Sequence, residues 1–168
     1  MLTKEQITNH LVALERKLSA AGVKGEICLY GGTVMCVVYD ARPATRDVDA
    51  VFVPVREIRA AAADVAREQG LPDDWLNDGV KGFLVEHPRR VFLDLPALKV
   101  FVPEADYLLA MKTLAARVDG TDREDVRFLI KHMGLTMPEQ VFGILEQYYP
   151  HQRIKPATQF FIEELFEK

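Results

Sequence analysis

The chain has 168 residues, of which 49% are apolar, so it is long enough for one well-buried domain or for a domain with a small helical appendage. Its formal net charge of −4 excludes a general attraction to nucleic acid, because such binding depends on Lys and Arg side chains that neutralise phosphates. Charged residues interrupt the apolar residues of segment 1–18, which argues against a signal peptide or a membrane span. We therefore expect a cytoplasmic protein with no membrane partner.

The two cysteines, Cys28 and Cys36, both fall within apolar runs. This placement predicts two thiols in the core and disfavours a disulfide or a zinc site. No structural metal is expected.

The first predicted element is an amphipathic helix. Thr3 and Gln6 have the spacing of a capping box, in which each side chain accepts a hydrogen bond from the backbone of the other residue. Apolar residues then mark one helical face up to the Ala-Ala-Gly stop at residues 20–22: Ile7, Leu11, Leu14 and Leu18.

Residues 26–39 allow two interpretations. Cys28–Tyr30 is a short apolar run typical of a strand, and Gly31 and Gly32 follow it. The next residues, Thr33–Tyr39, are rich in β-branched side chains, and Gly-Gly suits a two-residue hairpin loop, so propensity alone favours two strands. In the other interpretation a helix begins at Thr33, and the glycines, which lack a Cβ, let the phosphates of a ligand approach the backbone.

An Asp-Val-Asp sequence stands at the head of the next predicted strand, Val48–Val53, which Pro54 ends. Asp47 and Asp49 are two residues apart, so on a strand their carboxylates leave from one face while Val48 points to the other. Two carboxylates on one face suit Mg²⁺ or Mn²⁺, because Mg²⁺ takes few protein carboxylates and leaves other positions for water and substrate phosphate. The alternative is that both aspartates form the solvent face of an edge strand.

The remaining pattern predicts one more helix, the completion of the sheet and a helical second half. Val55–Gln69 is an Ala-rich helix closed by Gly70, and the apolar runs 91–95 and 98–102 suit strands. Segment 71–88 is interpreted as turns with a short helix or strand. Two more pairs have capping-box spacing: Thr121 with Glu124 and Thr136 with Glu139.

These elements predict an α/β (α+β) fold, with a small mixed sheet flanked by helices and a C-terminal helical bundle. Residues 1–104 form the expected α/β core, and residues 105–168 form the helical region packed on it, as parts of a single compact unit.

The order of these features resembles the nucleotidyltransferase superfamily, whose signature is Gly-Gly or Gly-Ser followed by Asp-x-Asp. Gly31-Gly32 and the sequence TRDVD (Thr45–Asp49) carry the first match. The segments YLLAMKTLAAR (Tyr107–Arg117) and TDREDVRFL (Thr121–Leu129) resemble the Lys-containing and Arg/Asp-rich helices of the AbiEii-type toxin branch and its uncharacterised bacterial relatives. The likeness covers most of the chain, from about residue 27 to residue 129.

The resemblance implies a nucleoside triphosphate held between a glycine turn and a metal ion. Asp47 and Asp49 become catalytic ligands of Mg²⁺ or Mn²⁺, and Gly31, Gly32 and Thr33 become nucleotide-binding residues. Thr33 is expected to cap the helix whose N-terminal N–H groups face the phosphates.

The resemblance implies two further residues. A third carboxylate on a later strand is the base for the attacking hydroxyl. Asp94 is the candidate, because a lone carboxylate in the apolar VFLDL segment is costly unless it has a partner, and Glu86 is the runner-up.

Lys112 matches a family lysine and is assigned to phosphate binding, with a snorkelling lysine as the alternative. Asp122, Arg123 and Asp125 match the Arg/Asp-rich helix, although acidic residues in a first turn also complement the helix dipole.

The implied function is metal-dependent transfer of a nucleotide from a nucleoside triphosphate to a hydroxyl group of a protein or an RNA such as a tRNA end. The family resemblance adds a toxin-antitoxin or phage-defence setting with an antitoxin as partner. One alternative is a catalytically impaired module that binds nucleotide or a partner on the same fold, and an intact third carboxylate separates the two. Another is a structural α/β interaction domain in which Gly-Gly is a hairpin turn, and the backbone of residues 33–39 decides that question.

Overall fold

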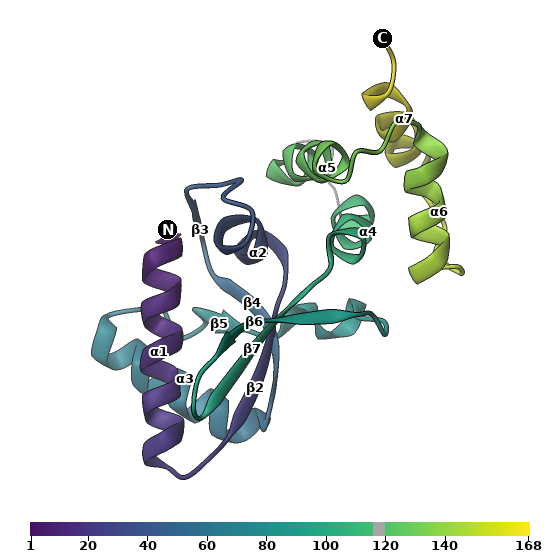
Figure 1. The fold of residues 1–168 in the computed structure, drawn as a ribbon. Coiled ribbons are helices and arrows are strands. Elements are labelled where there is room, and N and C mark those ends of the chain that lie inside the picture. Colours follow the sequence, from purple (N-terminus) through teal and green to yellow (C-terminus); the bar gives the residue numbers. More distant parts are fainter. Residues whose placement is uncertain (116–119) are drawn as a thin grey trace. The chain divides into compact units, whose positions relative to one another are not determined.

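The computed structural model describes residues 1–115 and 120–168 and has an α+β fold with a mixed sheet flanked by helices, as predicted. Its contacts divide the chain into two compact units (Figure 1). Unit 1 comprises Met1–Leu84 and Arg89–Pro103, and unit 2 comprises Val85–Pro88 and Glu104–Lys168.

Unit 1 holds the described strands and the first three α-helices. The elements in chain order are β1 (Leu2–Thr3), α1 (Lys4–Ala20), β2 (Gly25–Leu29), α2 (Gly31–Val37), β3 (Ala44–Thr45), β4 (Val48–Val53), α3 (Val55–Gln69), β5 (Leu76–Asn77), the 3₁₀ helix η1 (Gly79–Phe83), β6 (Arg89–Asp94) and β7 (Leu98–Pro103). Cys28 and Cys36 are buried free thiols, as predicted, and burial raises the pKa of both.

The main sheet of unit 1 has five strands in the order β5-β4-β2-β7-β6. β2 pairs antiparallel with β4 and parallel with β7. β6 is antiparallel to β7, and β5 is parallel to β4. A separate short pair joins β1 to β3. The two apolar runs predicted to complete the sheet therefore do so as β6 and β7.

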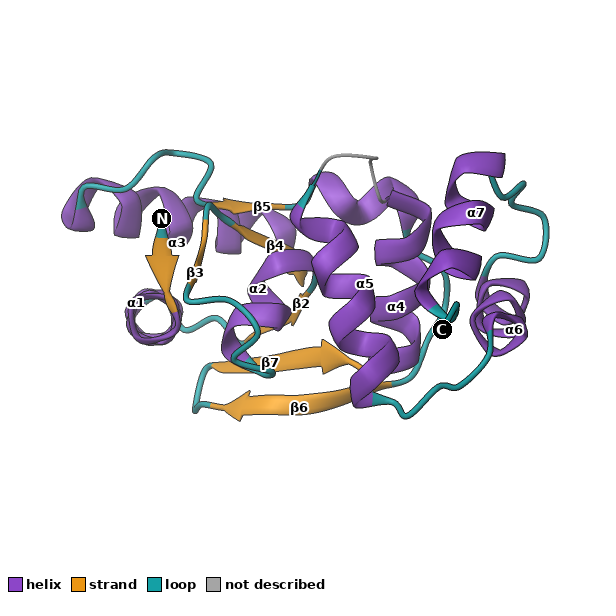
Figure 2. Ribbon diagram, turned by 90° about the horizontal axis from the view of Figure 1, so that it is seen from above, coloured by secondary structure: helices purple, strands orange, loops and turns teal. Residues whose placement is uncertain are grey.

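Helices α1 and α3 lie side by side and meet over the start of β2 (Figure 2). A Cβ built on Gly25 of β2 would lie 2.9 Å from Ile58 Cδ1 of α3 and 3.2 Å from Leu18 Cδ1 of α1, so a larger residue would displace these side chains. The capping box at the start of α1 is confirmed, since Thr3 Oγ1 accepts from the Gln6 N–H at 3.2 Å and Gln6 Oε1 accepts from the Thr3 N–H at 2.9 Å.

Helix α2 excludes the hairpin interpretation of Gly-Gly. It begins at Gly31, two residues before the predicted start at Thr33, and Tyr30 is its N-cap. Gly31 has a φ of +62°, in the left-handed region that favours glycine. Residues 32–37 are all buried, so packing in the core outweighs the β propensity of the β-branched side chains.

Unit 2 contains four described helices: α4 (Ala105–Ala115), α5 (Thr121–His132), α6 (Pro138–Tyr148) and α7 (Pro156–Leu165). The segment Val85–Pro88 belongs here because the His87 ring stacks on Tyr107 at a centroid distance of 3.9 Å, and the Val85 N–H donates to the Tyr107 hydroxyl at 3.2 Å. Arg117, at the end of the Lys-containing segment, lies outside the described residues.

The two capping boxes predicted in the second half are wrong. Helix α5 follows Gly120, which makes no side-chain cap, so Thr121 already lies in the first turn. Before α6 the Gln140 side chain, not that of Glu139, accepts from the Thr136 N–H at 2.7 Å. The Thr-x-x-Glu spacing does not specify which residue enters the helix first.

Burial of one tyrosine in unit 2 lowers the acidity of its hydroxyl group. Tyr148 donates to Asp106 Oδ2 at 2.9 Å. Burial, followed by this hydrogen bond and the negative charge of Asp106, raises the pKa of Tyr148 to about 12 from 10.0. The folded state thus holds this proton more tightly than the unfolded state does. The associated stability is complete below the unfolded pKa and is lost as the pH rises through the folded pKa.

We expect the wild type to lose more stability than Tyr148→Phe between about pH 9 and about pH 12, because the variant has no proton to release at this position. Urea unfolding at a series of pH values measures the slope for each protein. Parallel slopes would show that Tyr148 titrates alike in the folded and unfolded states.

Candidate functional site

The antiparallel pairing of β2 with β4 brings the Gly-Gly turn and the Asp-x-Asp sequence to the same edge of the sheet. Leu29 at the end of β2 pairs with Ala50, and the next N–H, from Tyr30, donates to the Asp49 carbonyl at 2.9 Å. A Cβ built on Gly31 would lie 2.9 Å from Asp49 Oδ2, closer than real Cβ contacts. A larger residue would therefore displace this carboxylate, and the backbone conformation itself favours glycine.

Gly32 makes room for two other side chains. Its Cβ would lie 2.6 Å from Nη1 of Arg42 and 2.9 Å from Oγ1 of Thr45. Thr45 is buried and Arg42 is half-buried. We expected bare glycine backbone facing a ligand. The structure instead places side chains of the same chain against both glycines.

Thr33 does not cap α2, which corrects the prediction from sequence. It lies within the helix, is fully buried, and its hydroxyl donates to the Asp47 carbonyl at 3.1 Å. This bond joins α2 to the start of β4, so Thr33 holds the backbone of Asp47.

Strand β5 is the third segment that lies beside the aspartates. Its parallel pairing with β4 puts Asn77 in register with Asp49. Asn77 Nδ2 donates to Asp47 Oδ2 at 3.1 Å, while Asn77 Oδ1 accepts from the Gly79 N–H at 3.3 Å. The two bonds together fix which end of the amide faces Asp47. Asp47 and Asp49 are half-buried on either side of Val48, which is fully buried.

Trp75 fixes the segment that carries Asn77. The indole is 1% exposed, and its Nε1 donates to the Ala62 carbonyl of α3 at 3.0 Å. The Trp75 carbonyl accepts from the Val48 N–H at 2.7 Å, which aligns this segment with β4. Segment 71–88, expected to contain turns with a short helix or strand, contains both β5 and η1.

The chemistry of these side chains fits a magnesium or manganese ion held by Asp47 and Asp49. Mg²⁺ commonly takes only one or two carboxylates and completes its coordination with water and substrate phosphates. The Asn77 bond engages one oxygen of Asp47, and a carboxylate has several further lone pairs. Among residues 1–115 and 120–168, no group of three or more His, Cys, Asp or Glu side chains is arranged to hold a metal. The fit therefore rests on these two carboxylates.

Asp94 does not join this site, which corrects the prediction from sequence. In the ladder of paired strands Asp94 stands opposite Lys99, Lys99 opposite Glu26, and Glu26 opposite Val53 at the far end of β4. At about 4.8 Å per strand and about 3.3 Å per residue, Asp94 lies on the order of 20 Å from Asp49. It is also exposed, so it needs no buried partner.

Lys112 and Glu86 belong to unit 2, so unit 1 assembles its aspartates and glycines without them. Lys112 is 7% exposed, and its Nζ lies 2.7 Å from Asp122 Oδ1 and 3.0 Å from Asp125 Oδ2. Asp125 is 3% exposed. Within unit 2 this lysine joins α4 to α5 through two ion pairs. Glu86 is exposed.

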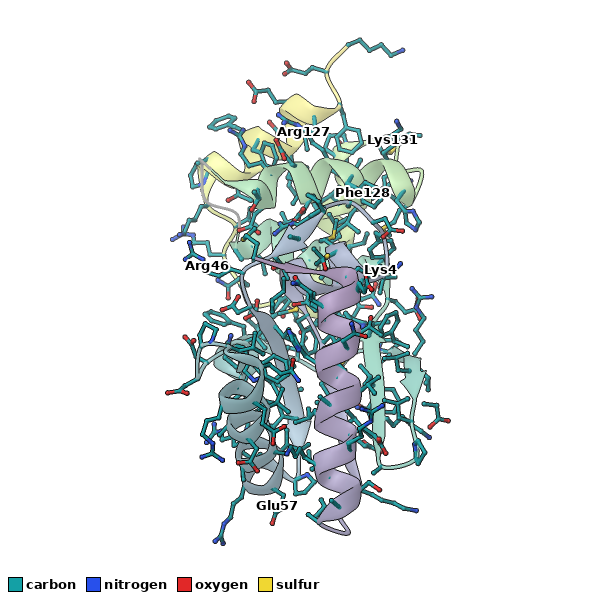
Figure 3. The ribbon with its side chains drawn as sticks, turned by 90° about the vertical axis from the view of Figure 1, so that its left-hand side faces the viewer. Lys4, Arg46, Glu57, Arg127, Phe128 and Lys131 are labelled. Atoms are coloured by element: carbon teal, nitrogen blue, oxygen red, sulfur yellow. The ribbon has the colours of Figure 1, made fainter. Side chains whose placement is uncertain are left out.

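Sequence reasoning missed Arg42 and Asn77. Arg42 stands in a loop without periodicity, and Asn77 stands in a segment interrupted by glycines. The available signal was Trp75, because a large apolar residue is expected to be buried. Its burial places Asn77, two residues further along the chain, close to the sheet. Arg46, the arginine beside the aspartates in sequence, is exposed on the surface of unit 1 (Figure 3).

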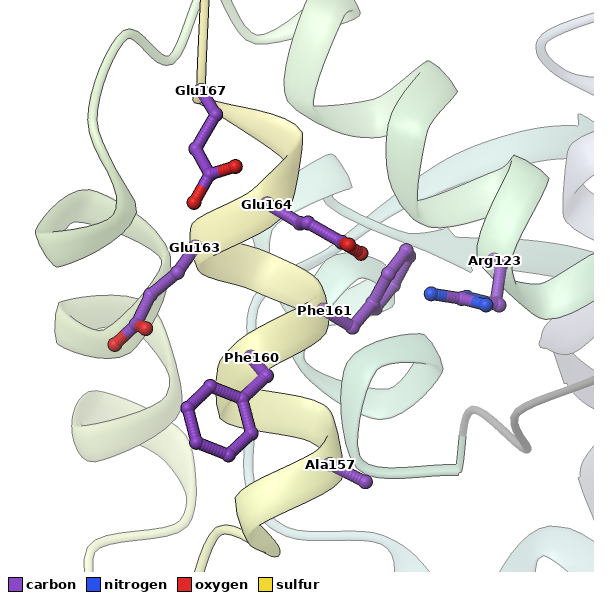
Figure 4. Close-up of a pocket in the computed structure, with 7 residues that line it drawn as sticks. All are labelled: Arg123, Ala157, Phe160, Phe161, Glu163, Glu164 and Glu167. Carbon is purple, nitrogen blue, oxygen red and sulfur yellow. The ribbon is translucent and has the colours of Figure 1, made fainter.

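Unit 2 has a hollow of about 370 Å³ beside α7 (Figure 4). It is lined by Arg123 and by residues of the C-terminal segment: Ala157, Phe160, Phe161, Glu163, Glu164 and Glu167. The Arg123 guanidinium lies over the Phe161 ring at 4.1 Å from its centroid. The three glutamates would repel a triphosphate, so this hollow does not suit the phosphates of a nucleotide.

The chain was compared with known proteins. No family model, no curated protein and no solved structure matches it. Within the described part of the chain, every helix is too short or too polar to cross a membrane.

Replacing Gly31 by Ala tests the contact between the turn and Asp49. We expect a loss of about 1 to 2 kcal/mol in unfolding free energy from the left-handed backbone, and a weaker affinity for Mg²⁺ because the new Cβ displaces the carboxylate. Gly70→Ala is the matched control, since Gly70 has a φ of +68° and open space around its Cβ position. Urea unfolding and calorimetric titration with Mg²⁺ measure both effects. Equal Mg²⁺ affinity in the two variants would contradict a role for this contact in metal binding.

Replacing Lys112 by Ala tests the ion pairs of unit 2. We expect a loss of about 3 kcal/mol, since Asp125 would be left as a buried charge without this cation. A second change, Asp125→Asn, should recover part of the loss in that background. Lys131→Ala is the control, because Lys131 is an exposed lysine of α5 (Figure 3). Urea unfolding measures all variants, and similar small losses in Lys112→Ala and Lys131→Ala would contradict the structural role.

Proposed function

We propose that unit 1 carries a metal-dependent nucleotidyltransferase site, which transfers a nucleotide from a nucleoside triphosphate to a hydroxyl group of a protein or an RNA. The observation that carries this proposal is the contact of the Asp49 carboxylate with Gly31, at the sheet edge where Asp47 also lies. The Gly-Gly and Asp-x-Asp resemblance supports it, since those two features occur in this order in the nucleotidyltransferase superfamily.

The electrostatics of the site require a cation. A triphosphate brings several negative charges close to two carboxylates. Without a cation, the triphosphate and the carboxylates would repel each other. Asp47 and Asp49 would hold Mg²⁺ or Mn²⁺, which when bound neutralises this charge and stabilises the attacking and leaving oxygens. The chain's own residues fix the ligands: Asn77 holds the Asp47 side chain and Thr33 holds the Asp47 backbone.

The acceptor is a small target on a protein or at an RNA end. The net charge of −4 gives no general attraction to a long RNA, whereas a tRNA end needs only a small basic patch. The resemblance to AbiEii-type toxins adds a cytoplasmic toxin-antitoxin or phage-defence role, with an antitoxin as partner.

A second candidate function is a module that binds nucleotide or a partner and does not transfer it. The position of Asp94 favours this candidate, because the carboxylate expected to act as base lies at the opposite end of the sheet from Asp49. A protein that binds triphosphate with Mg²⁺ and labels no acceptor would fit this second function.

Incubation with each α-labelled nucleoside triphosphate, Mg²⁺ and cell extract tests transfer directly. We expect a labelled protein or RNA, and a loss of more than about 100-fold in Asp47→Asn and Asp49→Asn, beyond the roughly 10- to 100-fold loss typical of residues that only support a metal ligand. Asp94→Asn is the matched control, since it removes an exposed carboxylate far from the site.

Two outcomes would contradict transfer at this site. The first is that label is incorporated equally by the wild type and by Asp49→Asn. The second is that Asp94→Asn loses as much activity as Asp49→Asn. Thermal unfolding of each variant checks that a lost activity is not a lost fold.

A further inference from the structure

We propose that Arg42 recognises the polyphosphate of the nucleotide at this site, an inference that rests on the proposed function. The Arg42 guanidinium and the Asp49 carboxylate lie against consecutive glycines. Arg42 Nη1 is 2.6 Å from the Cβ position of Gly32, and Asp49 Oδ2 is 2.9 Å from that of Gly31. A cationic group and a metal-binding carboxylate thus flank one glycine turn.

The loop that carries Arg42 is fixed at both ends. On one side the Ala41 N–H donates to the Met35 carbonyl of α2 at 2.9 Å, directly after Asp40, whose φ is 50°. On the other side Thr45 of β3 pairs with Leu2 of β1. Arg42 is therefore positioned by the fold of unit 1, and only its half-buried side chain needs to adjust to a ligand.

The chemistry of the guanidinium suits this role. A triphosphate keeps negative charge beyond the oxygens that a metal ion binds, and a planar guanidinium can donate two parallel hydrogen bonds to a phosphate. Arg46, the nearest arginine to the aspartates in sequence, is exposed.

Gly32 gives a way to move Arg42 without removing its charge. An added Cβ must displace Arg42 Nη1, which is the far end of a flexible side chain, and must shift Thr45 Oγ1. Alanine is favourable in a helix, so Gly32→Ala in α2 keeps the net charge and the local backbone. A loss of polyphosphate affinity in this variant would then not be due to a change of charge, and agreement with Arg42→Gln would point to the guanidinium.

Calorimetric titration with inorganic tripolyphosphate in excess Mg²⁺ tests the proposal, because this probe has no base or sugar. We expect Arg42→Gln to bind about 10- to 100-fold more weakly than the wild type, the range for a lost hydrogen bond to a charged group. Gly32→Ala should also weaken binding, and Arg42→Lys should recover part of the affinity. Arg46→Gln, with the same charge change at an exposed position, should change affinity by no more than about twofold.

The outcomes separate this proposal from the function on which it rests. If the wild type binds tripolyphosphate and ATP with Mg²⁺, and Arg42→Gln binds them as well as Arg46→Gln does, Arg42 is not the recognition residue and the proposed function stands. If the wild type binds none of the four nucleoside triphosphates or tripolyphosphate, both are overturned. Circular dichroism monitors folding, and should Arg42→Gln unfold, undiminished binding by folded Gly32→Ala would overturn the proposal.

Discussion

The hydrogen bond from the Tyr30 N–H to the Asp49 carbonyl, at 2.9 Å, extends the antiparallel ladder of β2 and β4 to the point where the chain turns into α2. Side chains alternate between the faces of a strand, so a shift of one residue in this ladder would bury Asp49 and expose Val48. The fully buried Val48 therefore fixes the register that presents the carboxylate. Packing of the core and construction of the site depend on the same pairing.

The elements with a strong period were predictable from the sequence because burial decides them. The stripe of α1 and the Gly70 cap of α3 follow from spacing and from the left-handed conformation that glycine tolerates. Residues 33–39 were not decided by their own composition, which favours strand. Their helical conformation at 33–37 depends on burial against other parts of unit 1, and single-residue propensity contains no information about that contact.

The errors at the site arise from register and from loops. Asp94 was chosen because an apolar strand surrounds it in sequence, but its distance from Asp49 depends on three strand pairings that no local pattern specifies. Arg42 and Asn77 reach the aspartates and glycines through a turn and a two-residue strand, where periodicity is absent. Lys112 shows the converse: its helix was predicted, while the two carboxylates that engage it became visible only with the packing of α4 on α5.

The distribution of charge explains how an acidic chain could accommodate a polyanion. The net charge of −4 acts through solvent and is screened over about 8 Å at physiological salt, whereas groups in contact with a bound phosphate act at hydrogen-bond distance. Under the proposed function, a divalent cation on Asp47 and Asp49 and one guanidinium beside Gly32 would favour a small polyphosphate locally. A long nucleic acid would instead meet the whole acidic surface, because its affinity grows with the number of phosphates that Lys and Arg neutralise. Under the proposed function, the size of the region over which the charges are summed would thus discriminate a nucleotide from an extended RNA.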